Sequence, residues 1–333
     1  MTDQEKMTTP ESVEQIVSRV LERSKKAGGL QHVICVACGG SLGGLFPLEY
    51  LLRLESKTLR TGSMSSNEFV HACPAFVGEK TLVVLMSKAG TTPETVTAAQ
   101  LAKEKGAQVM TLSIALDVPL MAPADETIVY SSNTDSYVQM EVPLQLRFGA
   151  ELLKACENWD HLDDMVQALA SVGPISESAI SAAKAPAQAF AEKHKDAPVI
   201  YTVGSGPLTN IAYTTSICHL MEMEWVHSSS FHSGEFFHGP FEITDKEVPF
   251  MLFMSSGRTR PLDERAESFL SRYTDNMEKI DATQYGVDGL AESVREYVEP
   301  IVVSAIARIY TTTLAEAKKH PFLHRKYMFK VEY

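Results

Sequence analysis

The first thirty residues are polar overall, and their apolar members recur at the spacing of one helix face. These members are Val13, Ile16, Val17, Val20 and Leu21. Thr9 can cap such a helix, Pro10 suits its first turn, and the glycine pair at 28–29 ends it. We therefore predict an opening helix. From residue 33 onward the pattern changes, and short apolar runs alternate with segments of helical spacing.

Three apolar runs in the first half of the chain predict buried strands. They cover residues 33–37, 82–86 and 108–113. The first ends in the small-residue turn CGGS at 38–41, and the second runs into SKAGTT at 87–92, after which Pro93 opens a helix. Strands that alternate with helices across such short turns predict a parallel, doubly wound sheet.

A similar order of strands and turns recurs in the second half. An apolar run over 199–203 ends in GSG, and another over 249–254 ends in SSG. Gly204 follows Cys38 by 166 positions and Ser255 follows Ser87 by 168. This agreement indicates an internal duplication.

We therefore expect an α/β protein with two tandem domains, each a doubly wound parallel sheet flanked by helices. Between the halves, residues 143–195 show a helical pattern, with Pro174 and Pro186 breaking the run, and the chain after Asp288 is again mainly helical. The expected divisions are an N-terminal helix (1–32), a first domain (33–165), a helical connection (166–196), a second domain (197–320) and a C-terminal tail near the active site (321–333).

The composition argues against several classes of function. The 333 residues carry a formal net charge of −12, whereas a nucleic-acid-binding surface needs a concentrated basic face, so we expect no nucleic-acid partner. No apolar run reaches the ~18 residues of a membrane span, and the first thirty residues lack the apolar core of a signal peptide. Five scattered cysteines suit a reduced protein of the cytoplasm, and Cys35 and Cys38 lack the second pair of a zinc site.

The turn at 87–92 has the features of an anion site. It follows a predicted buried strand and precedes a helix, so it places backbone N–H groups, the hydroxyls of Ser87 and Thr92 and the ammonium of Lys88 at a helix N-terminus. The alternative is a helix cap and nothing more. The turn at 38–41 leaves a neighbouring strand at the same sheet edge, and two such turns favour a phosphate site. Neither a G-x-G-x-x-G nor a GxxxxGK[ST] nucleotide motif is present in the expected context.

Acidic, imidazole and aromatic side chains are concentrated between residues 221 and 242. The titratable ones are Glu222, Glu224, Glu235, Glu242, His227, His232 and His238. Carboxylates among aromatic rings tend to have raised pKa values, and histidine titrates near neutrality, so the two suit acid–base catalysis. Metal binding by the histidines is the alternative, although they lack an HExxH-type spacing. For Glu224 taken alone we expect an unremarkable structural role, such as a surface charge.

These segments resemble the sugar isomerase (SIS) domain proteins. The resemblance rests on the turns CGGS and SKAGTT, on their duplication and above all on EFFHGPFEI at 235–243. In two-lobed members of that family a catalytic glutamate precedes the histidine of an HGP turn by sixteen residues, as Glu222 precedes His238 here. The resemblance therefore implies that Glu222 and His238 are catalytic.

The resemblance also implies a set of phosphate-binding residues. The family's S-x-S-G-x-T loop matches Ser87, Gly90 and Thr92, with Ala89 in place of the second serine, and Ser41 matches the serine that ends the first turn. One phosphate hydrogen bond of the family is therefore in question here. The full set of expected substrate-binding residues is Gly40, Ser41, Ser87, Lys88, Gly90, Thr92 and Glu235.

A closer resemblance extends over nearly the whole chain. YTVGSG at 201–206, the run from 221 to 245 and the terminal YMFKVEY at 327–333 are similar to the bacterial fructosamine 6-phosphate deglycases. Within that branch the enzymes for 6-phosphofructose-aspartate are the most similar, with those for fructoselysine and glucoselysine 6-phosphates next.

The implied activity is cleavage of a sugar 6-phosphate that carries an amino acid as a ketoamine. His238 would help to open the cyclic sugar at its ring oxygen. Glu222 would take the C1 proton and return it at C2 through an enaminol, and water would cleave the resulting imine to an amino acid and glucose 6-phosphate. An amine on C2 of a glucose skeleton would instead give fructose 6-phosphate. This chemistry requires no metal or organic cofactor.

Two alternatives stay open at this point. One is a ketose/aldose or amino-sugar 6-phosphate isomerase, although the chain starts only some thirty residues before its first predicted strand, so we expect no glutaminase part that would supply ammonia. The other is a sugar-phosphate sensor without catalysis, although no basic helix-turn-helix segment precedes Val33.

The loop from Phe231 to Phe241 predicts an interface. Four phenylalanines lie within these eleven glycine-broken residues, which is typical of an interface core. The resemblance implies a homodimer with shared active sites, in which Glu222 of one chain acts with His238 of the other. The amino acid that the sugar carries is not specified by the sequence, and candidate residues to recognise it are His232, Glu235, His324, Arg325 and Lys326.

Overall fold

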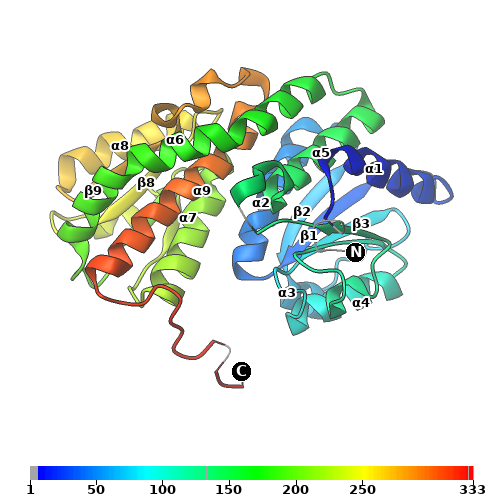
Figure 1. Cartoon of the computed structure of the whole chain (residues 1–333), viewed down its shortest axis with the longest axis horizontal. Helices are drawn as coiled ribbons and strands as arrows, with labels where there is room; N and C mark the ends of the chain where they lie inside the picture. Colours follow the sequence, from blue (N-terminus) through cyan, green and yellow to red (C-terminus); the bar gives the residue numbers. More distant parts are fainter. Residues whose placement is uncertain (1–6, 133, 329, 333) are drawn as a thin grey trace. The chain divides into compact units, whose positions relative to one another are not determined.

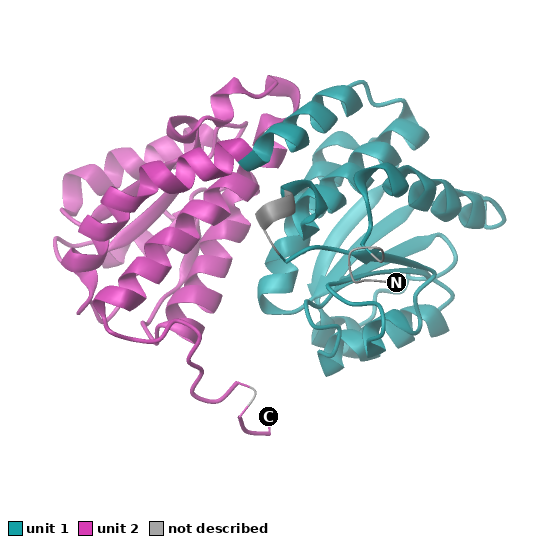
Figure 2. Ribbon diagram, in the orientation of Figure 1, with its two compact units in different colours: residues 1–173 teal, residues 174–333 magenta. Residues whose placement is uncertain are grey.

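The computed structural model describes residues 7–132, 134–328 and 330–332 and divides into two compact units. Unit 1 comprises Met1–Gly173 and unit 2 comprises Pro174–Tyr333 (Figure 2). Residues 1–6 of the expected N-terminal segment, and 329 and 333 of the expected tail, lie outside the described residues. None of the described helices combines the length and the apolar character needed to cross a lipid bilayer.

Unit 1 is a parallel sheet covered by helices on both faces (Figure 1). In chain order it contains α1 (Pro10–Lys25), β1 (His32–Ala37), α2 (Gly39–Glu55), β2 (Arg60–Ser65), α3 (Ser66–His71), β3 (Thr81–Met86), α4 (Pro93–Glu104), β4 (Gln108–Ser113), η2 (Pro119–Met121), β5 (Glu126–Val129), η3 (Thr134–Gln139), α5 (Glu141–Glu157) and the start of α6 (Leu162–His194). The strand order is β2-β1-β3-β4-β5, and every pair is parallel. Helix α2 packs on one face of the sheet and α3 and α4 on the other.

Burial of apolar side chains holds the central strands of unit 1 in place. Every residue of β3 is buried, and Val83 and Leu85 share one core cluster with Ile34 and Val36 of β1. Alanines of α4, among them Ala98, pack against this cluster, and their small side chains let the helix approach the sheet closely. The continuous apolar runs that predicted buried strands are therefore explained by helices on both faces.

Unit 2 is a second parallel sheet, with the strand order β7-β6-β8-β9. After α6 it contains β6 (Tyr201–Gly204), η4 (Gly206–Leu208), α7 (Thr209–Thr214), the π-helix η5 (Thr215–Met223), β7 (Ser230–His232), η6 (Pro240–Ile243), β8 (Phe250–Met254), α8 (Arg260–Tyr273), β9 (Met277–Asp281), η7 (Ala282–Tyr285), η8 (Val287–Gly289) and α9 (Glu292–Ala317). Helix α8 packs on β8 and β9, and α7 packs on β6, β7 and β8.

Four strands of the two sheets correspond in order, which confirms the predicted pair of doubly wound domains. Strands β6, β8 and β9 begin at Tyr201, Phe250 and Met277, each 169 positions after the first residues of β1, β3 and β4. The order β7-β6-β8-β9 repeats β2-β1-β3-β4, and β5 of unit 1 has no counterpart among the described strands of unit 2. The chain therefore consists of two similar α/β domains in tandem.

The prediction that Pro174 and Pro186 break the helical run was wrong. The run divides after Glu157 instead, and α6 continues through both prolines. Both prolines are exposed, while Ala179, Ala183 and Ala187 keep an unbroken buried stripe at four-residue intervals. Packing of this stripe outweighs the backbone hydrogen bonds that the prolines remove.

The segment from Gly206 to Met223 consists of three helical pieces in place of one regular helix. They are η4, α7 and the π-helix η5, and Glu222 lies in the last turn of the π-helix. Wide turns of this kind are frequent at functional sites.

Candidate active site

The loop of residues 87–92 joins β3 to α4 in a compact shape that requires a glycine. The backbone N–H of Gly90 donates to the carbonyl of Ser87 at 3.0 Å, and Gly90 has φ +67°. A Cβ atom on Gly90 would lie 2.2 Å from Cγ2 of Val118. No other residue type fits this position, because a side chain would face both a strained backbone and a direct collision.

Thr92 stands at the N-cap position of α4, but its side chain does not cap the helix as the sequence suggested. Its hydroxyl hydrogen-bonds the hydroxyl of Ser87 at 2.9 Å instead. Ser87 is buried, whereas Lys88 is exposed at the mouth of the loop. The first N–H groups of a helix lack partners within it, so this loop offers hydroxyls, N–H groups and an ammonium to an anion.

A second helix start lies beside this loop. Ala37 pairs with Met86 in the sheet, so β1 and β3 end at the same level. The predicted turn at 38–41 is in fact the first turn of α2, with Cys38 at the N-cap position, Gly40 exposed and Ser41 half-buried. Within unit 1 the structure thus brings the expected phosphate-binding segments to one edge of the sheet.

Lys88 also has an acidic neighbour that the sequence analysis missed. Burial raises the pKa of Glu141, the first residue of α5, and the charge of Lys88 partly offsets that rise. Because Glu141 is separated from Lys88 by 53 positions and carries no motif, nothing in the sequence pattern pointed to it.

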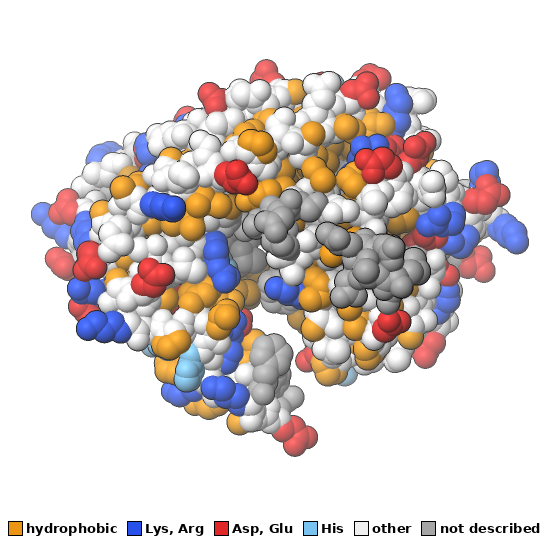
Figure 3. All heavy atoms as spheres, viewed as in Figure 1, with side chains coloured by type: hydrophobic (Ala, Val, Ile, Leu, Met, Phe, Trp, Pro, Cys, Tyr) orange, Lys and Arg blue, Asp and Glu red, His pale blue; other side chains and the backbone are white. Residues whose placement is uncertain are grey.

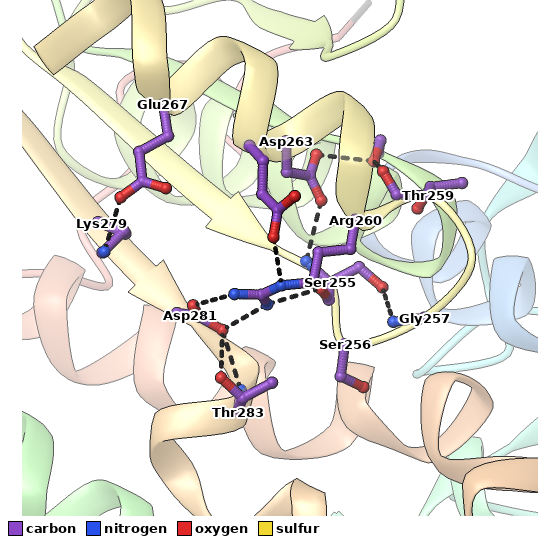
Figure 4. A network of polar contacts seen from close by, with 12 residues as sticks. Ser255, Ser256, Gly257, Thr259, Arg260, Asp263, Glu267, Lys279, Asp281 and Thr283 are labelled. Atoms are coloured by element: carbon purple, nitrogen blue, oxygen red, sulfur yellow. Dashed lines mark hydrogen bonds and ion pairs between the residues drawn. The ribbon is translucent and has the colours of Figure 1, made fainter.

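The corresponding loop of unit 2, at residues 255–259, is filled by the unit's own carboxylates. Figure 4 shows Asp263 of α8 pointing toward the loop, where it accepts a hydrogen bond from the backbone N–H of Ser255 at 3.0 Å. The same carboxylate accepts from the hydroxyls of Ser205 at 2.7 Å and Ser233 at 2.6 Å. Asp263 therefore occupies the position that an external anion would need.

A second carboxylate reaches the same loop from α9. Glu299 accepts from the hydroxyl of Ser255 at 2.6 Å and from the backbone N–H of Ser256 at 2.9 Å. Burial raises the pKa of Glu299 to about 7, against the opposing effect of these hydrogen bonds. Of the two equivalent loops, the one in unit 2 is satisfied internally, and the one in unit 1 suits an external phosphate.

Glu222, the expected catalytic base, is paired with a cation rather than surrounded by apolar rings alone. Nε of Arg325 donates to Oε1 of Glu222 at 2.5 Å. The side chains are 20% and 14% exposed, so the pair is largely shielded from water. Arg325 lies in the segment that follows α9, and the ion pair holds this part of the segment beside the π-helix.

Further basic groups surround this pair. The guanidinium of Arg308 lies 4.3 Å from the ring centre of Phe322, and its charge acts on Arg325. Burial, with the charges of these two arginines, lowers the pKa of His219 to about 4, so this imidazole is neutral at pH 7. Nδ1 of His219 lies 3.1 Å from the hydroxyl of Thr311. The surroundings of Glu222 are thus basic and suit an anionic ligand.

His238 is exposed on a turn that the following residues fix. Its backbone N–H donates to the carbonyl of Glu235 at 2.9 Å, and Gly239 has φ +135° before Pro240 starts η6. Among the described residues, no hydrogen bond or ion pair joins His238 to Glu222. Glu235 is also exposed. One protomer therefore presents His238 and Glu235 to solvent without connecting them to the carboxylate.

The phenylalanines of the 231–241 loop, which we expect at an interface, already pack in large part within unit 2. Phe236 is fully buried, and Phe231, Phe237 and Phe241 pack against its cluster within unit 2. Ring contacts with Phe269 of α8 account for much of this packing. Phe236 is thus part of the unit's own core, the other three rings are half-buried against it, and an interface at this loop stays a prediction.

Glu224 is the opposite of the surface charge we expected. Its side chain is 1% exposed, and neither carboxyl oxygen has a hydrogen-bond partner among the described residues. Burial raises its pKa to about 8, and the charge of Lys318 only partly offsets this rise. The burial of Glu224 could not be predicted, because the pattern of apolar and polar residues at an irregular helix end does not show which side faces inward.

We expect Ser87→Ala and Thr92→Val to weaken binding of glucose 6-phosphate by about tenfold each, because each removes a hydroxyl from the loop. Calorimetry measures the affinity. Ser256→Ala is the matched control, since its hydroxyl bonds Glu299 in the internally filled loop. An equal loss of affinity in the control would contradict the assignment of the phosphate to unit 1.

We expect Glu224→Gln to stabilise the protein increasingly as the pH rises. The folded pKa of about 8 lies above the ordinary value of 4.5, so the wild type loses stability between these pH values while the neutral amide does not. The increase in the free energy of unfolding over the wild type should be absent below pH 4.5 and on the order of a few kcal/mol above pH 8. Urea unfolding at pH 4 and pH 9 measures it, and equal effects at both would refute the buried carboxylate.

Comparison with known proteins places these features in a family, although no family model matches the sequence. Fructosamine deglycase FrlB of Bacillus subtilis is 38% identical over 311 residues, which cover 92% of this chain and 94% of the relative. Fructoselysine 6-phosphate deglycase of Escherichia coli is 26% identical over 96% of this chain and 90% of its own length. A solved structure from Salmonella typhimurium, described as a phosphosugar isomerase, superposes with a TM-score of 0.94 at 39% identity and covers 98% of both chains. The chain belongs to the fructosamine deglycase family of SIS-domain proteins.

Proposed function

We propose that this protein is a deglycase that cleaves a 6-phosphorylated fructose–amino acid conjugate to a hexose 6-phosphate and a free amino acid. The observation that carries the proposal is the similarity to fructosamine deglycase over 92% of the chain. The loop of residues 87–92 in unit 1 supports it, because its hydroxyls, helix start and lysine suit the phosphate that such a conjugate carries.

In the proposed reaction Glu222 acts as the base. It takes a proton from C1 of the open-chain ketoamine while the C2 oxygen gains one, which gives an enaminol. Glu222 then returns its proton to C2, the nitrogen loses its own, and an imine forms between C1 and nitrogen. Water adds to C1 and the C1–N bond breaks, which releases the amino acid and leaves the aldehyde of glucose 6-phosphate. The step is a hydrolysis, and no oxidant or reductant is required.

The other residues position the reactants in this scheme. Arg325 fixes the carboxylate of Glu222 through their ion pair. His238 moves a proton at the ring oxygen when the cyclic sugar opens, and its exposed position on a rigid turn suits contact with a bound sugar. Ser87, Thr92 and Lys88 hold the phosphate and so fix the carbon chain.

The description of the Salmonella structure favours isomerisation of a phosphosugar as the second candidate. The two activities are separated by incubating the protein with phosphorylated fructose-aspartate, fructose-lysine and glucose-lysine and assaying both products. A deglycase releases one amino acid per hexose 6-phosphate. Interconversion of hexose 6-phosphates without release of any amino acid would favour the isomerase.

We further propose that the enzyme works in the cytoplasm as a homodimer with shared sites. The absence of any bond between Glu222 and His238 in the described residues of one protomer is consistent with a histidine supplied by the partner. The five cysteines are all free thiols, as is usual in a reducing compartment.

We expect Glu222→Gln to lower turnover by about a hundredfold or more with the fold intact, because the amide keeps the size of the side chain and cannot move a proton. Steady-state release of amino acid measures the loss, and thermal unfolding checks the fold. Glu224→Gln is the comparison, and its effect on turnover should be milder. Equal losses in both variants would mean that the wrong carboxylate has been assigned.

We expect mixed dimers of Glu222→Gln and His238→Ala chains to recover activity. If each site combines Glu222 of one chain with His238 of the other, a mixed dimer contains one intact site. Turnover is assayed after co-refolding, with each variant refolded alone as the control. No recovery despite demonstrated subunit exchange would show that each protomer builds its own site.

A further inference from the structure

A pocket of about 570 Å³ lies in unit 2, at the ends of three helices. Its walls come from the residues that directly follow α6, the π-helix η5 and α9, together with the last residue of α9. Its lining residues are Lys195, Asp196, Glu224, Trp225, Ala317, Lys318, Lys319 and His320. The proposed reaction assigns no role to this pocket.

Glu224 is the buried acceptor of this pocket. Its two carboxyl oxygens are inaccessible to solvent and lack any hydrogen-bond donor among the described residues. Lys318 is near enough for its charge to act on Glu224, but in the described part of the chain it makes no hydrogen bond to either carboxyl oxygen. A buried carboxyl group without a hydrogen-bond partner bears an uncompensated desolvation cost, which a ligand that donates hydrogen bonds would relieve.

His320 supplies a second acceptor. It hydrogen-bonds the backbone of Met223, while its Nε2 is buried and has no partner among the described residues. Its other ring nitrogen, Nδ1, therefore makes that bond as a donor. Burial lowers the pKa of His320, so the ring is neutral at pH 7 and Nε2 is left as an acceptor. One carboxylate and one imidazole nitrogen together suit an ammonium group, which has three donors.

Trp225 forms a wall of the pocket in a strained conformation. Its φ is +58°, a region that bulky residues rarely adopt, and such strain tends to persist at functional sites. The residue is 45% exposed, and its ring meets the ring of His320 edge-on, with centroids 4.6 Å apart. Nζ of Lys326 lies 5.8 Å from the centre of the indole ring, so Trp225 already faces one cation at the edge of the pocket.

Cationic side chains at the pocket favour a negatively charged group on the ligand. Lys318 and Lys319 have no ion-pair partner among the described residues, whereas Lys195 is paired with Glu192 at 2.9 Å. In Figure 3 the segment that follows α9 shows basic, hydrophobic and histidine side chains gathered together. The pocket therefore combines acceptors for an ammonium with two lysines that suit a carboxylate.

We propose that this pocket binds a free α-amino acid, whose ammonium contacts Glu224 and His320 and whose carboxylate contacts Lys318 and Lys319. A metal ion fits less well, because the described residues contain no group of three metal-ligating side chains, and the lysines would repel a cation without a carboxylate of its own. Free amino acid is the product class of the proposed reaction, but the site follows from its charges alone and does not rest on that reaction.

Trp225 reports on this site directly. The protein contains two tryptophans, and Trp159→Phe leaves Trp225 as the only indole. Titration with glycine, L-aspartate and L-lysine should change its fluorescence with saturation, while methylamine and acetate, which each carry half of the charges, should bind at least about tenfold more weakly. Calorimetry on the unsubstituted protein repeats the measurement in case the loss of Trp159, which bonds Glu55 at 2.9 Å, disturbs the fold.

Glu224→Gln should weaken amino-acid binding by about tenfold or more, because it removes the charge that the ammonium meets. Glu242→Gln is the matched control, since Glu242 is exposed in the same unit and should have no effect. No saturable binding, equal binding of the half-ligands, or unchanged affinity in Glu224→Gln would each overturn the proposal. None of these readouts uses a sugar phosphate, so the result is separate from the success or failure of the deglycase assay.

Binding should also release protons at pH 7. Burial raises the pKa of Glu224 to about 8, and an ammonium that pairs with it requires the ionised form. The charged or titratable groups that face it from the three segments are Lys195, Asp196, Lys318, Lys319 and His320. His320 is already neutral, so calorimetry in two buffers of different ionisation enthalpy should give a release of up to one proton, which Glu224→Gln abolishes. Binding without proton release would contradict the role of Glu224.

Discussion

The parallel pairing of β1 with β3 determines where unit 1 can hold a ligand. Because Ala37 and Met86 are opposite each other, the two strands deliver helices α2 and α4 from the same level of the sheet. Each helix start carries N–H groups without partners in the helix, and the small residues of both loops leave them accessible. The strand register therefore brings the two helix starts together. The side chains add to them the hydrogen-bonded hydroxyls of Ser87 and Thr92 and the charge of Lys88.

The duplicated fold gives unit 2 the same geometry with a different outcome. There the loop after β8 meets Asp263 and Glu299, which take hydrogen bonds from Ser255 and Ser256 that an external anion would otherwise receive. Two copies of one architecture have thus become distinct: one offers donors to a ligand, and the other uses its donors for its own stability. The second copy instead contributes a carboxylate on a π-helix, paired with Arg325.

Local signals predicted most of the fold and part of the site. The central strands could be predicted because burial on both faces makes each of them a continuous apolar run. The edge strands β2, with the sequence RTGSMS, and β7, with three residues, could not be predicted because they have no such run. The loop of Ser87 could be identified as a candidate site because its polar side chains are adjacent in the sequence. The pairing of Glu222 with Arg325 could not be predicted, because 103 positions separate the two residues and only the fold brings them together. The burial of Glu224 depends in the same way on α9.

The π-helix over Thr215–Met223 determines the direction in which the carboxylates at its end point. A π-turn holds one more residue than an α-turn, so each of its residues advances by a smaller angle about the helix axis. If the same residues wound as an α-helix, the side chains at and beyond the end of the segment would turn about that axis, and Glu222 and Glu224 would leave Arg325 and the pocket together. Loss of one residue would offset this turn, so the length of the segment and its wider winding are matched to each other.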